Sequence, residues 1–268
     1  MTFMNLENPD HAYLFGFLQA DGHLFRGRGQ KGRLTVELNA RDIELLERFK
    51  ALCPYPSSVT TRTRATNFSP ESRTAVWSVC ALAFRRELVC LGLPEGRKSA
   101  RIAPPGIPFS ARDYLRGLID ADGSLGMTAK GNPFVSLVTQ SDALAEYFCE
   151  SVRQLTGVVH RPRRNRRDSV FNLYYEREPA VELSHRLYQA AGLSLRRKQE
   201  IALRLQTWTR PPGMKRIPNR RIWIPAEDEI LRAAPTLEEA SRRLNRSLAS
   251  CTMRLWRLEK LQAPQLNP

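Results

Sequence analysis

Apolar residues recur at two different periods between residues 10 and 206, and the changes of period predict alternating helices and strands. From Asp42 to Leu52 they recur every three to four positions, which predicts a helix with one buried face. From Arg33 to Asn39 apolar and polar side chains alternate, which predicts a half-buried strand. Further helices are predicted at 9–21, 82–91, 110–122, 142–156 and 179–191, and further extended segments at 23–28, 58–64, 74–80, 125–128, 134–139, 158–163 and 170–175.

The order of these elements, α-β-β-α-β-β-α, occurs twice because the chain contains an internal repeat. Residues 13–24 are a near-copy of residues 114–126. Pairs of like residues recur at a spacing of 100 or 101: Gly16 and Gly117, Asp21 and Asp122, Asp42 and Asp142, Lys98 and Lys198. A single duplication explains all four spacings. We therefore predict one repeat in residues 1–103 and a second in residues 104–206.

The predicted fold class is α+β, with two pseudo-symmetric repeats that each form a four-stranded antiparallel sheet. Helices cover one face of each sheet, and the other face is free to be polar. Such an open face can enter the major groove of DNA, where arginine reads guanine or holds phosphate, and both roles stay open. The segment 160–167 can also be a solvated loop. The residues expected to contact DNA are Arg26, Arg28, Thr60, Arg62, Arg64, Arg161, Arg163, Arg164, Arg166, Arg167 and Asn172.

The first helices of the two repeats are predicted to pack closely against each other. Gly16 and Ala20 share one helix face, as do Gly117 and Ala121, and small residues let two backbones approach. Asn8 before Pro9 is a good N-cap for the first helix. Ser110 with Asp113 predicts a capping box for the second helix.

Asp21 and Asp122 end these two helices, each followed by a glycine that suits the C′ position. A carboxylate there faces the negative end of the helix dipole. Two packed helices would also bring the two carboxylates together. A divalent cation between them would offset both penalties, so Asp21 and Asp122 are candidate metal ligands.

The charge of the chain points to a polyanionic partner. Its 268 residues carry a formal net charge of +15, which favours nucleic acid. No run is apolar and long enough to span a membrane, and no N-terminal signal segment is evident. The five cysteines form no C-x-x-C pair, which indicates free thiols in a reducing compartment without a zinc site. We expect a cytoplasmic, nucleoid-associated protein in a bacterium or phage, or an organellar or nuclear one in a eukaryote.

The C-terminal quarter predicts a separate module. Residues 207–222 are rich in proline and basic residues, which is typical of a linker. Residues 223–268 predict three short helices, with Thr236 and Glu239 as a capping box. This pattern resembles a Myb/SANT-type helix-turn-helix, whose third helix would place Ser250, Arg254 and Arg257 against DNA. The alternative is a tail that packs on the repeats.

Residues 115–123, Leu-Arg-Gly-Leu-Ile-Asp-Ala-Asp-Gly, resemble the signature of the LAGLIDADG homing endonucleases. These are DNA-cutting enzymes usually encoded by introns or inteins, and the first repeat carries a second, looser copy of the signature. Arg116 departs from the signature, and Gln19 replaces its first aspartate in repeat one. The resemblance implies that the two sheets form a saddle on DNA. The methionine at position 1 and the lack of splice-junction motifs argue against an embedded intein.

The resemblance also implies roles for particular residues. Asp21 and Asp122 would bind two or three Mg²⁺ ions, for which Mn²⁺ would substitute, helped by the backbone carbonyls of Ala20 and Ala121. A lysine at the position of Lys98 and Lys198 lies beside the active site, although it can also anchor phosphate or cap a helix. Gln140 resembles a water-positioning glutamine. We place Ala40 at the equivalent position of repeat one, with Asn39 adjacent to it.

We therefore expect a monomeric, site-specific double-strand DNA endonuclease that leaves short 3′ overhangs and needs no obligate protein partner. Two alternatives remain. Some transcriptional regulators join a degenerate LAGLIDADG core to a helix-turn-helix, although they lack the acidic pair. An intron maturase uses the same fold to bind RNA. The Asp21 and Asp122 pair favours the nuclease over the regulator.

Overall fold

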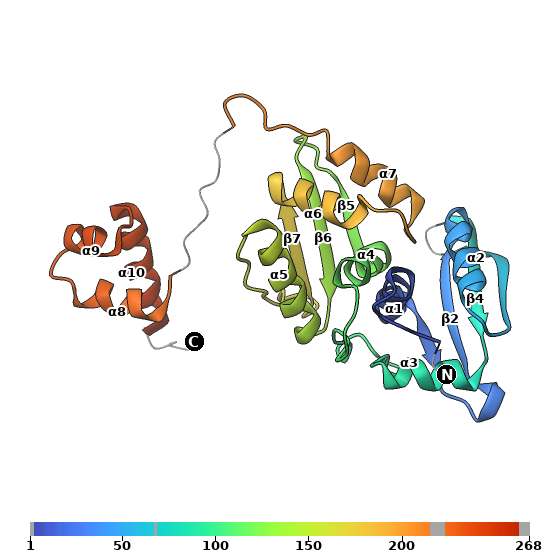
Figure 1. Ribbon diagram of the computed structural model, residues 1–268. Coiled ribbons are helices and arrows are strands. Elements are labelled where there is room, and N and C mark those ends of the chain that lie inside the picture. The colour runs from blue at the N-terminus through green and yellow to red at the C-terminus, as the bar shows by residue number, and fades with distance from the viewer. Residues whose placement is uncertain (1–2, 67–68, 215–222, 263–268) are drawn as a thin grey trace. The chain divides into compact units, whose positions relative to one another are not determined.

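A computed structural model describes residues 3–66, 69–214 and 223–262 (Figure 1). The chain divides into two compact units, Met1–Met214 and Lys215–Pro268, and each is described by itself below. The predicted boundary between the second repeat and the linker, at 206–207, lies a few residues before this division. Within 207–214, Trp208 Nε1 donates to Gly131 O at 2.9 Å and Arg210 forms an ion pair with Glu178. The predicted linker therefore begins as a part of the second repeat, and its residues 215–222 lie outside the described residues.

Repeat one contains a four-stranded antiparallel sheet in the order β1-β2-β4-β3, as predicted. Its elements are α1 (Pro9–Asp21), β1 (His23–Phe25), the 3₁₀ turns η1 (Gly29–Lys31) and η2 (Ala40–Asp42), β2 (Arg33–Asn39), α2 (Ile43–Leu52), β3 (Ser57–Thr66), β4 (Ser69–Val79) and α3 (Leu82–Cys90). Trp77, Val36 and Leu34 point into the core on the face that the helices cover. The residues that alternate with them along β2 and β4 point to the open face.

Repeat two has a three-stranded antiparallel sheet in the described residues, in the order β5-β6-β7. Its elements are α4 (Ala111–Asp122), β5 (Gly123–Met127), β6 (Pro133–Thr139), α5 (Asp142–Thr156), β7 (Phe171–Glu176), α6 (Glu178–Tyr188) and α7 (Arg196–Leu205). The strand predicted at 158–163 is wrong, because only an isolated bridge joins Arg164 to Phe171 there. Pro162 has no N–H to donate to a ladder, and the neighbouring arginines repel one another.

Helices α1 and α4 lie side by side between the two sheets (Figure 1). Their contact is as close as the small residues predicted. A Cβ at Gly16 would lie 2.3 Å from Tyr114 O, and a Cβ at Gly117 would lie 2.2 Å from Tyr13 O. Both distances are far below van der Waals contact. No other residue than glycine therefore fits either position without moving a helix.

The helix N-caps lie at the predicted residues, but only some of the predicted side-chain hydrogen bonds form. Asn8 caps α1 by accepting from the backbone N–H groups of Asp10 and His11. Ser110 is at the N-cap of α4, but its hydroxyl donates to the carboxylate of Asp113 at 2.6 Å and no capping-box bond to the backbone forms. Thr236 accepts from Glu239 N at 3.2 Å, which is one of the two bonds of the predicted capping box.

Gly22 and Gly123 are not left-handed C′ residues, contrary to the prediction. Their φ angles are −71° and −89°, which any residue adopts. Glycine is instead required for space, because a Cβ at Gly22 would lie 2.6 Å from Leu18 O and one at Gly123 would lie 2.7 Å from Ile119 O. The chain thus passes directly from each helix into a strand and keeps the preceding aspartate at the helix end.

The C-terminal unit contains three helices in its described residues: α8 (Pro225–Ala233), α9 (Leu237–Leu244) and α10 (Leu248–Gln262). They pack on a small core of Leu231, Ala240, Leu244, Cys251 and Leu258. Asn245, in the left-handed conformation, ends α9 and starts the short turn to α10. Trp223 covers one side of this core and stacks under the guanidinium of Arg246.

Among the described residues, no helix combines the length and hydropathy that a bilayer crossing requires.

Candidate active site and nucleic-acid interface

Asp21 and Asp122 are the last residues of the packed helices α1 and α4. Partial loss of solvent raises the pKa of both carboxyls. The negative charge of Asp122 raises the pKa of Asp21 further. Both residues are exposed, so a ligand can reach either carboxylate from outside.

Two lysines occupy the negative ends of the same helices. Lys98, which follows α3, donates from Nζ to Gln19 O at 2.6 Å and also to Ala20 O. Lys198, in the first turn of α7, donates to Ile119 O, Asp120 O and Gly123 O at 2.6–2.8 Å. Each ammonium therefore binds carbonyls at the negative end of its helix and offsets the helix dipole. The lysines therefore offset part of the electrostatic penalty at the helix ends, which the sequence had assigned to a metal ion alone.

Burial lowers the pKa of both lysines. The pKa of Lys98 falls because of desolvation, although Asp122 and Asp21 oppose the change. Lys198 is 5% exposed, and burial lowers its pKa to about 8. The two lysines thus differ, since the one that contacts α4 is the more deeply buried.

A cavity of about 230 Å³ joins predicted residues of both repeats. Ala20 and Lys98 come from repeat one, while Asp122 and Gln140 come from repeat two; Val138 and Ser99 also line it. Gln140 directly follows β6, where its side chain is exposed on the open face. The structure therefore brings together a carboxylate, a cation and an amide in one hollow.

The register of the sheets corrects the equivalent of Gln140 in repeat one. His23 pairs with Thr35 and Ser124 pairs with Ser136, so equivalent strand positions are 101 apart. Asn39, and not Ala40, therefore matches Gln140. The sequence missed this because repeat one has one additional residue between Asn39 and Asp42, which forms the 3₁₀ turn η2. By the same register Glu37 matches Val138, so a carboxylate replaces an apolar side chain.

The first aspartate of the signature in repeat two does not line the cavity. Asp120 is buried and accepts from Tyr13 OH, Tyr188 OH and Leu195 N at 2.6–2.7 Å. Gln19 holds the equivalent place in repeat one and accepts from Tyr114 OH. Tyr13 and Tyr114 are themselves 101 positions apart, so the tyrosine of each repeat donates to the equivalent position of the other repeat. That spacing is a signal in the sequence that could have identified these reciprocal hydrogen bonds. Asp120 and Gln19 hold the helix pair together, which explains why an amide is tolerated at position 19.

The two carboxylates suit a small hard cation. Magnesium takes few protein ligands and completes its shell with water and substrate oxygens. Among the described residues no cluster holds three or more histidine, cysteine or acidic side chains. A metal would therefore rest on Asp21, Asp122 and backbone carbonyls. Of the two carbonyls predicted to help, Ala20 O already accepts from Lys98 Nζ.

The open face of the first sheet displays Thr60, Arg62 and Arg64, all exposed as predicted. Arg26 and Arg28 are exposed beside β1, and Asn172 is exposed opposite Val138 on the second sheet. The other predicted arginines lie in the loop between α5 and β7: Arg161, Arg163, Arg164, Arg166 and Arg167. Arg164 is held by Asp142, by Gln140 O and by Ser169 O. It therefore shapes the loop beside Gln140.

The C-terminal residues predicted to contact DNA differ in how far they are exposed. Arg254 forms an ion pair with Asp228, with contacts of 2.5 and 2.7 Å, and Ser250 is half-buried. Arg257 is exposed. The sequence could not show that Asp228 on α8 would engage Arg254.

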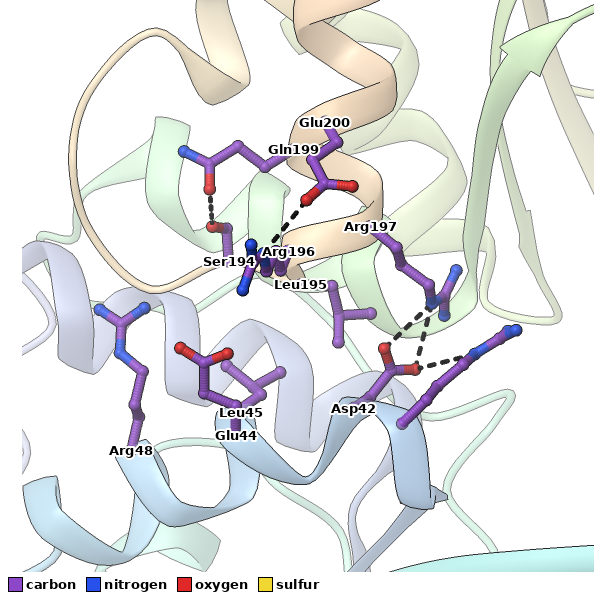
Figure 2. Close-up of a pocket in the computed structure, with 11 residues that line it drawn as sticks. Asp42, Glu44, Leu45, Arg48, Ser194, Leu195, Arg196, Arg197, Gln199 and Glu200 are labelled. Atoms are coloured by element: carbon purple, nitrogen blue, oxygen red, sulfur yellow. Dashed lines mark hydrogen bonds and ion pairs between the residues drawn. The ribbon is translucent and has the colours of Figure 1, made fainter.

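A larger hollow of about 530 Å³ lies between the starts of α2 and α7 (Figure 2). Asp42 receives Arg197 of the other repeat at 3.1 Å there, and Arg196 pairs with Glu200. Arg48 donates to Gly192 O at 3.3 Å. Because its charges are largely paired with one another, this hollow joins the repeats rather than offering unpaired groups.

Residues 110–190 match the family model described as a LAGLIDADG-like domain. The homing endonuclease I-WcaI, bound to its DNA recognition sequence, is similar at a TM-score of 0.51 and 14% identity, over 74% of this chain and 87% of that one. The fold of the repeats is thus that of a homing endonuclease of known structure. The domain match covers residues 110–190 only, which therefore form a LAGLIDADG-like domain.

Further structures match at lower TM-scores. The LAGLIDADG homing endonuclease I-LtrWI, bound to target DNA, gives a TM-score of 0.44 and 11% identity over 75% of this chain and 91% of that one. Full-length DUF199/WhiA from Thermatoga maritima gives 0.44 and 12% over 97% and 94%. No curated protein matches the chain.

Proposed function

We propose that this protein is a site-specific endonuclease that cuts both strands of a DNA target. The observation that carries the proposal is the electrostatic interaction of Asp21 with Asp122 at the ends of two packed helices, with Asp122, Lys98 and Gln140 lining one hollow. Nothing in the packing of the helices requires two carboxylates at this place. Their raised pKa values show that the fold alone holds them at a cost.

The residues suit hydrolysis of a phosphodiester. Divalent cations held by Asp21 and Asp122, Mg²⁺ in the simplest case, would activate water and stabilise the leaving oxygen. The amide of Gln140, which lines the same hollow as Asp122, can orient a water by one hydrogen bond. Lys98 places a cation where negative charge develops at phosphorus. Lys198 uses its N–H groups on three carbonyls and so acts by fixing the end of α4.

The DNA would lie across the open faces of the two sheets. Thr60, Arg62, Arg64 and Asn172 point away from the helices, and the arginine loop 161–167 adds positive charge beside Gln140. The C-terminal unit, whose three helices have a helix-turn-helix order, would add a second DNA contact through Arg257. Binding should weaken steeply with salt, because each phosphate contact releases counterions. A nearly flat salt dependence would contradict the use of these faces.

The test is cleavage of a random-site plasmid library in magnesium buffer, with the ends sequenced. We expect discrete ends with short 3′ overhangs, and no ends with the Asp21→Asn/Asp122→Asn variant. That variant is the matched control because it keeps the shape of both side chains. Ends at random positions, or ends that persist in the variant, would point to a contaminating nuclease and against the proposal.

A second candidate function is a DNA-binding regulator that does not cut. One observation favours it: Lys98 and Lys198 already satisfy the helix ends without a metal. The library experiment separates the two functions. Selective binding of one sequence without cleavage, at every magnesium and manganese concentration, would establish the regulator.

A further inference from the structure

One arginine of the open face is held by an acidic side chain, and its neighbour is not. Glu37 Oε1 accepts from a terminal guanidinium nitrogen of Arg64 at 2.9 Å and from Thr74 Oγ1 at 2.8 Å. The side chains of Arg64 and Glu37 are 58% and 35% exposed. In the described part of the chain, Arg62 takes part in no ion pair. Arg64 and Arg62 therefore differ in the charge beside them, and we expect them to bind different partners.

The register places this pair on the surface that faces away from the helices. Glu37 on β2 lies opposite Val76 on β4, and Thr74 lies opposite Arg62 on β3. Arg64 is one row further along, opposite Ser72. The Glu37–Arg64 contact therefore runs diagonally across three strands. Rigid strands and two hydrogen bonds fix the carboxylate, and the carboxylate in turn limits where the guanidinium can point.

The charge of Glu37 makes Arg64 a poor ligand for phosphate. A carboxylate beside the guanidinium repels the phosphate oxygens that a lone arginine attracts. The edge of a guanine carries no net charge, so this repulsion does not apply to it. Arg64 has five N–H donors, and only one of its nitrogens is engaged by Glu37. The others remain for O6 and N7 of guanine, the pair of acceptors that arginine reads in the major groove.

Repeat two lacks this arrangement. The residue equivalent to Glu37 is Val138, which is 43% exposed and lies opposite Asn172. The Glu37–Arg64 pair is thus a feature of one half of the molecule only. Its carboxylate also contributes to the raised pKa of Asp21, which places the pair near the proposed cutting site.

We propose that Glu37 positions Arg64 to read a guanine in the half of the target bound by repeat one, while the unpaired Arg62 holds phosphate. This assignment rests on the proposed binding of DNA to the open sheet faces. Glu37 acts through Arg64 and makes the arginine selective where it would otherwise be a general cation. The guanine lies in the central part of the target, on the side of Asp21.

The test is selection of bound duplexes from a random library by the full-length chain in EDTA, so that no strand is cut. Wild-type protein is compared with Glu37→Val, Glu37→Gln, Arg64→Ala and Arg62→Ala. Val is the residue at the equivalent position of repeat two, so it suits the strand. We expect Arg64→Ala and Glu37→Val each to reduce the guanine preference at the same single position by about tenfold, because one good bidentate contact discriminates to that degree. Glu37→Gln, which keeps the shape and loses the charge, is expected to reduce it less.

Arg62→Ala is the matched control on the same strand. It is expected to weaken binding evenly across sequences and to lower the salt slope by about one. Melting curves of each variant check the fold, and Glu37→Gln carries the test if Glu37→Val is unfolded. The proposal is overturned if both Glu37 variants keep every wild-type preference, if they weaken binding evenly, or if the wild type selects no sequence. Selection with the expected guanine, but no cleavage in magnesium, would overturn only the proposed nuclease.

Discussion

At the scale of single residues, the fold holds the two carboxylates and the lysines around them at a cost in stability. Asp21 and Asp122 lie at the negative ends of two helices, and both have raised pKa values. The folded state therefore binds protons more tightly than the unfolded chain at these positions. As pH rises through the interval between the unfolded and the folded pKa, the stability of the protein falls. These residues cost stability at neutral pH, which is typical of functional groups.

We expect Asp21→Asn to raise the melting temperature in metal-free buffer and to abolish cleavage. Removing one charge ends the repulsion between the carboxylates, and because both are exposed the gain is small, about 1–3 °C. Differential scanning calorimetry in EDTA measures it. Glu47→Asn, on the exposed side of α2, is the control and should leave the melting temperature and cleavage near the wild-type values. A lower melting temperature for Asp21→Asn would show that the carboxylate stabilises the fold.

Lys198 gives a prediction for pH. Its pKa of about 8 means that the ammonium loses its proton within the range where DNA cleavage is measured. We expect the cleavage rate to fall as pH rises through about 8, because the neutral amine no longer offsets the carbonyls at the end of α4. Stability should move in the opposite direction. Between about pH 8 and the usual lysine pKa of 10.5 the unfolded chain binds the proton that the folded chain has lost, so the free energy of unfolding rises.

A pH series of single-turnover rates, with urea unfolding at the same pH values, checks both signs. Lys198→Arg keeps its charge throughout, so its rate should show no fall near pH 8. A wild-type rate that stays level to pH 9 would contradict this role for Lys198.

At the scale of elements, most helices and strands follow from the hydrophobic periodicity, and the failures have physical causes. The bounds of the helix at Asp142–Thr156 agree with the prediction, because a Ser141 cap and a left-handed Gly157 mark both ends. The strand at 158–163 failed because periodicity does not account for the missing N–H of Pro162 or for arginine repulsion. The amide pair Gln140 and Asn39 needed the strand register, which one extra residue in a turn had hidden.

The candidate site was predictable where the residue type itself carries the chemistry. Asp122 was predicted from the signature, Lys98 and Gln140 were predicted from the resemblance to the family, and the structure brings all three into one cavity. What the sequence could not show are pairings between elements. The ion pairs of Arg64 with Glu37 and of Arg254 with Asp228 join residues far apart in the chain and follow no spacing rule.

The helix contact gives a prediction about glycine. Gly16→Ala should destabilise the protein by about 1–3 kcal/mol or more, since its Cβ would overlap the backbone oxygen of Tyr114 and the helices must separate. Gly106→Ala is a matched control, because nothing lies within 4 Å of its Cβ position and its φ is ordinary. Urea unfolding of both variants measures the difference. Equal stabilities would show that the helices yield without cost.

At the scale of the whole molecule, the two repeats have the same fold but different side chains at equivalent positions of the candidate site. Asp122 shares a cavity with Gln140 and Val138, and the strand register puts Asn39 and Glu37 at the equivalent positions of repeat one. The side chain of Asn39 is shorter and accepts from Arg41 N at 3.1 Å. An amide used in a turn is less free to orient water. The two halves of the site are therefore unequal.

We expect this inequality to show as cutting of one strand before the other. A time course on supercoiled plasmid that carries the target should accumulate nicked circles before linear product. Gln140→Asn should slow the first cut, while Asn39→Gln should shorten the life of the nicked form. Linear product that appears with no nicked intermediate would contradict the prediction, and strand-specific end labels identify which bond is cut first.

The exchange of tyrosines between the central helices has a consequence for how such a chain could arise. Tyr13 donates to Asp120 and Tyr114 donates to Gln19, so each repeat completes the hydrogen bonds of the other. In a dimer of two copies of repeat two, Tyr114 of one copy would take the place of Tyr13. In a dimer of two copies of repeat one, Tyr13 would take the place of Tyr114. Gly16 and Gly117 are interchangeable in the same way. The junction thus retains the symmetry of a dimer of identical subunits, and either repeat expressed alone should pair with itself and bind a palindromic form of its own half of the target.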